Sequence, residues 1–324
     1  MNNNPSGKSW FKAKIKKALK TLANSNFLTR AIYNWRDQRH LARVVAADCK
    51  QYGTETTFRE NAVEIRKGNQ CMLISRKHAI YAGTLSKSFD VYFSAVVPEH
   101  ENGLSIADFS KPKVHTLKNG MQFEFSTWPE EIEAIDGYFM WYKPKVGETV
   151  FDLGAHCGFS VYFFSTLVGP NGRVICFEPD PTNLEILRRN MDRYNLRNVT
   201  VVPAAIGGAD GTAQFSSEGT IGSQLISLLG RESVGSVISV PVVSLKSAFE
   251  KYGFPTFCKM DIEGAEIEAL SSATECLAAN PVHFVVDTNH TLDGTLTDTR
   301  VEAIVKILAA SCEAFQRPNS NCPL

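Results

Sequence analysis

The stretch that decides the fold is VFDLGAHCG, residues 150–158. A short, mostly apolar run leads to Gly154, a second glycine follows at Gly158, and a further apolar stretch comes after it. This order is typical of a buried strand that runs through a glycine turn into a helix. In an open α/β sheet, ligands bind beyond the carboxyl ends of the strands, so the turn is expected to face a ligand.

The spacing of the glycines indicates which class of ligand the turn can bind. The turn has the form Gly-x-x-x-Gly, without the Gly-x-Gly-x-x-Gly pattern that cradles a pyrophosphate. It also lacks the Gly-Lys-Ser/Thr sequence of a phosphate-binding loop. A nucleoside without phosphates therefore fits this turn better than a dinucleotide or a nucleoside triphosphate.

Strands and helices are predicted to alternate from about residue 129, which favours a parallel sheet covered on both faces. The predicted strands are residues 149–153, 173–177, 199–203, 256–260 and 282–286, and the predicted helices are 159–167, 181–194 and 263–278. Residues 212–249 interrupt this alternation and are expected to form an insertion over the site. A sixth strand is predicted at 313–316, and little sequence follows for a seventh. Either the C-terminus is shortened or the N-terminal region completes the sheet.

Three further strand ends carry residues suited to a nucleoside site. Glu178 ends the second strand, where an acid can accept hydrogen bonds from both ribose hydroxyls. The third strand ends in small residues around Ala205, against which an adenine ring could lie. The fourth strand ends in KMDIEG, which places Asp261 at the same crevice. Glu263 and Glu266 begin the next helix, where acids suit the helix dipole, so they are expected to cap or orient it.

Taken together, the segments VFDLGAHCGFS, FEPDPTNLEILRRN, AAIGGADG and KMDIEGAEIEAL resemble the FkbM-type methyltransferases over about residues 130–315. The resemblance implies a Rossmann-like, doubly wound α/β sheet and S-adenosylmethionine as the cofactor. It also implies that the methionine part of the cofactor is surrounded by Asp152, Gly154, Ala155 and Gly158. Glu178 would hold the ribose and Ala205 would line the adenine pocket. The family is mostly associated with O-methylation, here of a hydroxyl on a sugar, a glycan or a secondary metabolite.

Two catalytic arrangements are compatible with the residues after the fifth strand, which read VDTNH. His290 could act as a general base beside Asp261, because the ordinary pKa of histidine lies near neutral pH. Alternatively, Asp261, Asp287 and Asn289 could hold Mg²⁺, which prefers oxygen ligands. The ion would then favour the alkoxide of the acceptor.

Two other functions are compatible with the sequence. One is N-methylation of a small amine, although no Asn/Asp-Pro-Pro-Tyr/Phe segment follows the fourth strand. The other is a non-catalytic scaffold that retains the fold. The presence of Asp152, Glu178 and Asp261 together argues against a scaffold.

The rest of the chain divides into two parts. Residues 1–50 are predicted to be a helical arm, and residues 1–43 contain ten Lys/Arg but a single acid. Residues 51–128 are predicted to be a small β-rich region, with alternating segments at 62–65, 71–74 and 91–97. Residues 129–324 form the predicted catalytic domain. The arm suits a peripheral membrane or a partner-protein contact, and no nucleic-acid partner is expected.

Cysteine usage and hydropathy favour a cytoplasmic location. The eight cysteines contain no CxxC pair, and Cys157, Cys176 and Cys258 lie in apolar stretches. They are expected to be reduced core residues. The N-terminus lacks the apolar run of a secretory signal.

Overall fold

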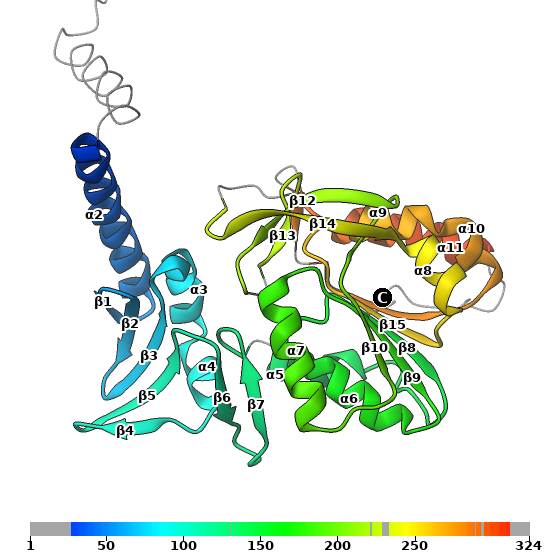
Figure 1. Cartoon of the computed structure of the whole chain (residues 1–324), viewed down its shortest axis with the longest axis horizontal. Helices are drawn as coiled ribbons and strands as arrows, with labels where there is room; N and C mark the ends of the chain where they lie inside the picture. Colours follow the sequence, from blue (N-terminus) through cyan, green and yellow to red (C-terminus); the bar gives the residue numbers. More distant parts are fainter. Residues whose placement is uncertain are drawn as a thin grey trace, which may run out of the picture.

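The computed structural model describes residues 27–129, 131–220, 222–228, 233–288, 290–292 and 295–311. Residues 1–26 of the predicted helical arm and the predicted sixth strand at 313–316 lie outside these residues. Figure 1 shows two parts side by side, an N-terminal module (residues 27–128) and a C-terminal domain. No helix in the described part of the chain is long and apolar enough to cross a membrane.

The N-terminal module combines a long helix with a five-stranded sheet. Helix α2 (Phe27–Gln51) precedes the sheet, whose strand order is β1-β2-β3-β5-β4. The strands are β1 (Glu55–Phe58), β2 (Ala62–Lys67), β3 (Gln70–Ser75), β4 (Glu99–Glu101) and β5 (Leu104–Phe109). These strands form a sheet of their own and do not extend the sheet of the C-terminal domain, so one of the two expected ways to complete that sheet is wrong.

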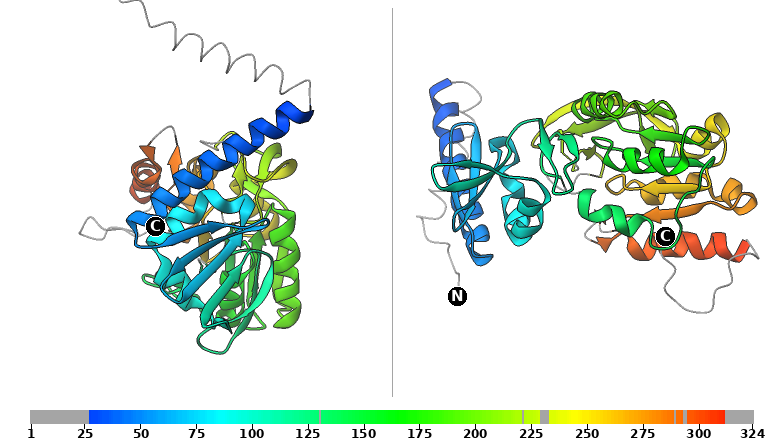
Figure 2. Two further views of the ribbon diagram at one scale, coloured as in Figure 1. Left: turned by 90° about the vertical axis from the view of Figure 1, so that its left-hand side faces the viewer. Right: turned by 90° about the horizontal axis from the view of Figure 1, so that it is seen from below.

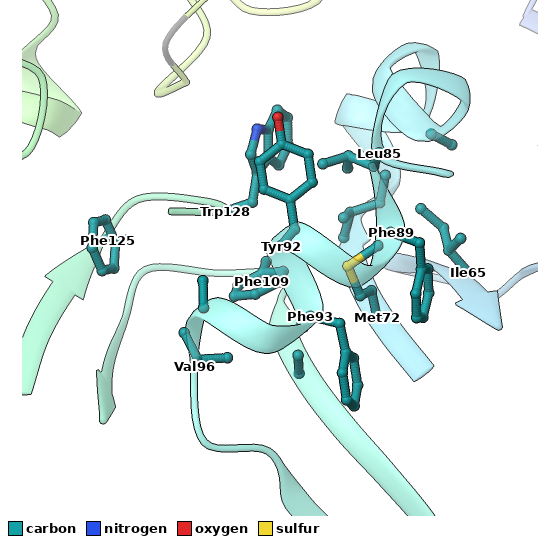
Figure 3. Packing of buried hydrophobic residues seen from close by; sticks show 14 of the residues in the cluster. Ile65, Met72, Leu85, Phe89, Tyr92, Phe93, Val96, Phe109, Phe125 and Trp128 are labelled. Carbon is teal, nitrogen blue, oxygen red and sulfur yellow. The ribbon is translucent and has the colours of Figure 1, made fainter. Parts of the chain in front are cut away.

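Three short helices lie between β3 and β4: η1 (Arg76–Tyr81), α3 (Ala82–Lys87) and α4 (Phe89–Ala95). The predicted β-like segment at 91–97 is therefore wrong, because most of it belongs to α4. Phe89, Tyr92 and Phe93 stand at helical spacing and are all buried in the core of the module. Figure 3 shows this core, which also contains Ile65 and Met72.

The hairpin of β6 (Lys113–Thr116) and β7 (Gln122–Phe125) joins the module to the C-terminal domain (Figure 1). Asn190 of the C-terminal domain pairs with the backbone of Glu124 through both ends of its amide, at 3.1 and 2.8 Å. The Glu124 carboxylate accepts two hydrogen bonds from Arg189, at 3.0 and 2.8 Å. Since Asn190 is buried, this contact is a packed interface with its polar groups satisfied.

The C-terminal domain is built on five parallel strands in the order β10-β9-β8-β15-β16. They are β8 (Thr149–Leu153), β9 (Arg173–Phe177), β10 (Val199–Val202), β15 (Phe257–Met260) and β16 (His283–Val286). All five strands predicted from the sequence are present, which confirms the Rossmann-like α/β fold. The strand order reverses between β8 and β15, and such a point is where ligands bind in open α/β sheets.

Helices cover both faces of this sheet (Figure 2). One face packs on α5 (Glu131–Tyr138), α6 (Phe159–Val168) and α7 (Pro181–Arg193). The other packs on α8 (Leu245–Tyr252), α9 (Glu266–Ser272), α10 (Thr274–Ala279) and α11 (Asp298–Ser311). Neighbouring residues of β8 serve opposite faces, since Val150 packs with the first group and Phe151 with the second. The single helix predicted at 263–278 is in fact two helices, α9 and α10.

A second, smaller sheet is inserted after β10, as the interruption at 212–249 predicted. Its strand order is β11-β14-β12-β13. The strands are β11 (Ala205–Gly207), β12 (Gly211–Ser217), β13 (Gln224–Leu225) and β14 (Ser236–Ser244). A short hairpin, β17 (Thr291–Leu292) with β18 (Thr295–Leu296), follows β16.

Candidate active site

A cavity of about 390 Å³ lies at the carboxyl ends of the parallel strands, at the reversal between β8 and β15. Its volume falls within the range of roughly 300–1,000 Å³ that small-molecule sites occupy. One wall is apolar and includes Ile206, Phe215 and Leu225, while Asp261, Glu263 and Asp287 face it from the strand ends. The cavity can therefore hold a molecule that is partly aromatic and partly cationic.

The glycine turn between β8 and α6 forms the floor of this cavity. Gly154 has a φ of +82°, and a β-carbon there would come within 1.9 Å of the Asp261 carbonyl oxygen. The backbone N–H groups of Gly154 and Ala155 both donate to the Phe177 carbonyl, at 3.0 and 2.9 Å. Only glycine can occupy position 154, because the turn passes directly against the end of β15.

Three of the six predicted cofactor residues line the cavity, and the other three do not. Gly154, Glu178 and Ala205 line the cavity. Asp152, Ala155 and Gly158 are buried and are not among the residues that line it. The predicted contact of these last three residues with a ligand stays a prediction.

Asp152 is fully buried and holds the turn from beneath. Its carboxylate accepts a hydrogen bond of 2.5 Å from Ser160 Oγ and lies 3.4 Å from Lys259 Nζ. Lys259 is also buried and donates to the Gly154 carbonyl at 2.6 Å, with Asp261 4.0 Å away. The Lys259 ammonium thus links the end of β15 to the end of β8. Lys259 was not among the site residues predicted from KMDIEG, although a lysine inside an apolar strand is itself a signal.

Glu178 lies at the end of β9, where both carboxylate oxygens accept backbone hydrogen bonds. Oε2 accepts from the His156 N–H at 2.8 Å, and Oε1 from the Asp180 N–H at 2.9 Å. Burial, together with the neighbouring Asp180 charge, raises the pKa of Glu178 to about 7. Each oxygen retains a lone pair, so the carboxylate can still accept hydrogen bonds from a ligand diol.

Asp261, Asp287 and His290 come together at the ends of β15 and β16. One potential ligand atom from each lies within 4.8 Å of the others. His290 Nε2 is 3.5 Å from Asp261 and 3.6 Å from Glu263. Asn289, the third residue of the predicted magnesium set, lies outside the described residues. Among the described residues, His290 lies beside the two predicted carboxylates and offers a third ligand atom.

The charges around His290 change its acid–base character. Burial opposes protonation, but Glu263 and Glu266 outweigh it and raise the pKa of His290 to about 11. His290 Nδ1 lies 3.0 Å from Glu266, which is fully buried. These carboxylates therefore favour the protonated imidazole, and the predicted base role of His290 stays a prediction.

The two glutamates after β15 have different positions. Glu266 Oε1 accepts from the N–H groups of Ile262 and Gly264, at 3.1 and 3.2 Å, which agrees with the predicted capping role. Glu263 instead lines the cavity with a φ of +56°, an uncommon conformation for a residue other than glycine. Burial and the neighbouring Asp261 raise the pKa of Glu263 to about 7, against the effect of His290.

Comparisons with known proteins agree with the class of fold that this site defines. The family described as the methyltransferase FkbM domain matches residues 152–301. A protein-L-isoaspartate O-methyltransferase of Methanothrix thermoacetophila is 36% identical over 74 residues, covering 23% of this chain and 33% of that protein. The chain thus spans about a third of the length of this curated relative.

Solved structures similar to the chain include a methyltransferase and a protein that binds S-adenosylmethionine. Methyltransferase FkbM from Methylobacillus flagellatus has a TM-score of 0.40 and 19% identity, over 56% of this chain and 43% of that one. Aeropyrum pernix fibrillarin, solved with natively bound S-adenosylmethionine, has a TM-score of 0.33 and 11% identity, over 63% and 85%.

The parallel sheet, the cavity at its reversal point and the family match together define the C-terminal domain as a Rossmann-like methyltransferase domain. Within that class, residues 152–301 match the FkbM methyltransferase family, and this match confirms the resemblance of the four sequence segments.

Proposed function

We propose that this protein transfers a methyl group from S-adenosylmethionine to a hydroxyl of a sugar, a glycan or a secondary metabolite. The observation that carries the proposal is the juxtaposition of two groups of residues in one cavity. Gly154, Glu178 and Ala205 stand on the nucleoside side, and the cluster of Asp261, Asp287 and His290 stands beside them. A cofactor and an acceptor bound there would meet at the reversal point of the sheet.

The cavity residues fit a cationic nucleoside. Asn183 is buried in the cavity wall, and its Oδ1 has no hydrogen-bond partner among the described residues. A ligand amine or hydroxyl could supply the missing donor. Asp261, Glu263 and Asp287 add negative charge, which favours a sulfonium, and the aromatic ring of Tyr138 also lines the cavity.

Positioning would be the main task of this chain during methyl transfer. S-adenosylmethionine supplies a methyl group on a good leaving group, so the reaction needs alignment more than it needs strong acid–base catalysis. The turn at Gly154 and the carboxylate of Glu178 would fix the nucleoside. The apolar wall would exclude water from the reacting centre.

Asp261, Asp287 and His290 would act on the acceptor side. Their two carboxylates and one imidazole form a donor set that fits a divalent cation, with Mg²⁺ and Mn²⁺ the first to test. Such an ion would lower the pKa of the acceptor hydroxyl. Cation binding requires a neutral imidazole, so it would compete with the proton that Glu263 and Glu266 hold on His290.

Calorimetric titration with S-adenosylmethionine tests the cofactor part of the proposal. Glu178→Ala is expected to weaken binding by roughly 1.5–3 kcal/mol, because hydrogen bonds from the ribose to a charged group are lost. Glu185→Ala is the matched control, since Glu185 lies on the solvent side of α7 with a side chain that is 73% exposed. It is expected to bind like the unsubstituted protein.

The acceptor is then sought by following cofactor consumption with hydroxylated compounds, in the presence and absence of Mg²⁺. Consumption that depends on a hydroxylated acceptor supports O-methylation, whereas consumption with amines alone would replace it by N-methylation. If the folded protein binds no S-adenosylmethionine, the proposed activity is wrong and a scaffold role takes its place.

A further inference from the structure

A polar seam connects the N-terminal module to one wall of the cavity. The wall segment, called the wall loop here, consists of residues 216–220 and 222–225, and Thr220, Ser223, Gln224 and Leu225 of this loop line the cavity. Tyr81 of the module donates from its hydroxyl to Glu218 Oε2 at 2.7 Å. Lys77 Nζ donates to the Glu218 carbonyl at 3.0 Å, and His78 Nε2 lies 2.9 Å from the same oxygen.

Two of the groups at this seam, Glu218 and His78, are buried. Glu218 is fully buried and also accepts a hydrogen bond of 2.9 Å from Ser216 Oγ. Burial lowers the pKa of His78 to about 4, so the ring is neutral. Because a carbonyl can only accept, Nε2 of His78 must carry the ring proton. Trp128 packs against both His78 and Tyr81, with ring centroids 6.0 and 5.3 Å away.

The opposite side of the wall loop is bound by the cofactor half of the domain. Asp180, which directly precedes α7, is fully buried. Its Oδ2 accepts from the Gly219 N–H at 3.0 Å and from Ser223 Oγ at 2.8 Å. Asn183 Nδ2 donates to the Thr220 carbonyl at 3.3 Å. The wall loop is thus held between the N-terminal module and the first turn of α7.

The same module also reaches the floor of the cavity. Ser126 Oγ lies 3.0 Å from Nε2 of His156, a cavity-lining residue with a φ of +47°. The Ser126 N–H also contacts Cys157 Sγ at 3.3 Å. His156 in turn donates its backbone N–H to Glu178. A contact made by the module therefore lies one hydrogen bond away from the carboxylate expected to hold the ribose.

We propose that the N-terminal module is a working part of the methyltransferase, in which Tyr81, His78 and Ser126 are positioning residues for the cofactor. Tyr81 and His78 act through Glu218 on the wall loop, and Ser126 acts through His156 on the glycine turn. The effect on the cofactor rests on the proposed function. The effect on the order of the wall loop does not.

The test compares two variants that each remove one hydroxyl from the interface between the module and the domain. Tyr81→Phe removes the donor to Glu218. Tyr194→Phe is the matched control, because the Tyr194 hydroxyl donates across the same interface to the Gln122 carbonyl, at 2.6 Å, and does not line the cavity. Both variants keep the aromatic ring and its packing.

Two readouts separate positioning from general stability. Hydrogen exchange without ligand is expected to speed up across the wall loop in Tyr81→Phe and to stay unchanged there in Tyr194→Phe. Binding of S-adenosylmethionine is expected to weaken roughly three- to tenfold in Tyr81→Phe, the effect of about one hydrogen bond, and to stay unchanged in the control. Ser126→Ala is expected to weaken binding without changing exchange in the wall loop.

Three results would overturn the proposal or the function on which it rests. Equal loop exchange in Tyr81→Phe and the unsubstituted protein would overturn the proposal, even if both variants lower the melting temperature. Faster loop exchange with unchanged binding would also overturn the positioning role. If the unsubstituted protein binds no S-adenosylmethionine, the proposed function fails, and loop exchange alone decides whether the module orders the wall.

Discussion

Replacing Lys259 by methionine should be among the most damaging single changes in the domain. The Lys259 side chain is 3% exposed, and its ammonium lies between the Gly154 carbonyl at 2.6 Å and Asp152 at 3.4 Å. Methionine fills nearly the same volume, so little of the cost comes from a cavity. The cost comes from Asp152, a fully buried carboxylate that loses the ammonium with which it is paired.

Removing one partner of a buried ion pair typically costs about 3–5 kcal/mol, and we expect Lys259→Met to fall in this range. The free energy of unfolding is measured by urea denaturation followed by circular dichroism. The double variant Lys259→Met/Asp152→Asn removes both charges and keeps an oxygen for Ser160. It is expected to recover roughly 2 kcal/mol of the loss, which a double-mutant cycle isolates as coupling between the two sites.

Lys246→Met is the control for this experiment, because Lys246 is an exposed lysine of α8. It should change the free energy of unfolding by no more than about 0.5 kcal/mol, as surface substitutions usually do. A Lys259→Met protein as stable as this control, or a double variant no more stable than Lys259→Met alone, would refute the reasoning.

Three further predictions concern the cavity itself. Because burial raises the pKa of Glu178 to about 7 and a ribose diol favours the ionised carboxylate, cofactor affinity should fall as pH drops through that value. Calorimetry across this range should show the fall for the unsubstituted protein and not for Glu178→Gln. A flat profile in both proteins would contradict it. Gly154→Ala should lower the melting temperature far more than Gly147→Ala. Both glycines have a positive φ, but only at Gly154 would the β-carbon meet backbone, at 1.9 Å, whereas nothing lies within 4 Å at Gly147. Similar melting temperatures would contradict the clash. Finally, EDTA should abolish turnover and Mg²⁺ or Mn²⁺ should restore it, except in Asp287→Asn. Full activity in EDTA would exclude the cation.

The central sheet was predictable because its signals are local. Strands buried on both faces appear as short apolar runs, and glycine or proline marks their ends. The predicted bounds of the first two strands, 149–153 and 173–177, agree with the structure, and the other three differ by one residue at one end. Three predicted cofactor residues, Gly154, Glu178 and Ala205, line the cavity because they follow strand ends that meet at one edge.

The features that sequence reasoning missed depend on contacts between distant residues. Tyr81 and Glu218 are 137 positions apart, and neither lies in a motif. The raised pKa of His290 arises from Glu263 and Glu266, whose convergence on the histidine cannot be read from their own helix-start pattern. Within the N-terminal module, the apolar residues at 89–93 fit a strand and a helix almost equally well. The helix forms there because its apolar side packs on the neighbouring sheet.

The pairing of Asn190 with Glu124 bears on how this protein can be recombined with its relatives. The Asn190 amide also donates to the Cys157 carbonyl at 3.0 Å. This one side chain of α7 therefore hydrogen-bonds both the connecting hairpin and the loop after β8. A chimera could join residues 129–324 to the N-terminal region of another methyltransferase of this type. The buried amide of Asn190 would then lie against the hairpin backbone of the other protein and not against Glu124. Exchange between homologues should therefore succeed only when the hairpin travels with the domain, which makes residue 113 a better crossover point than residue 129.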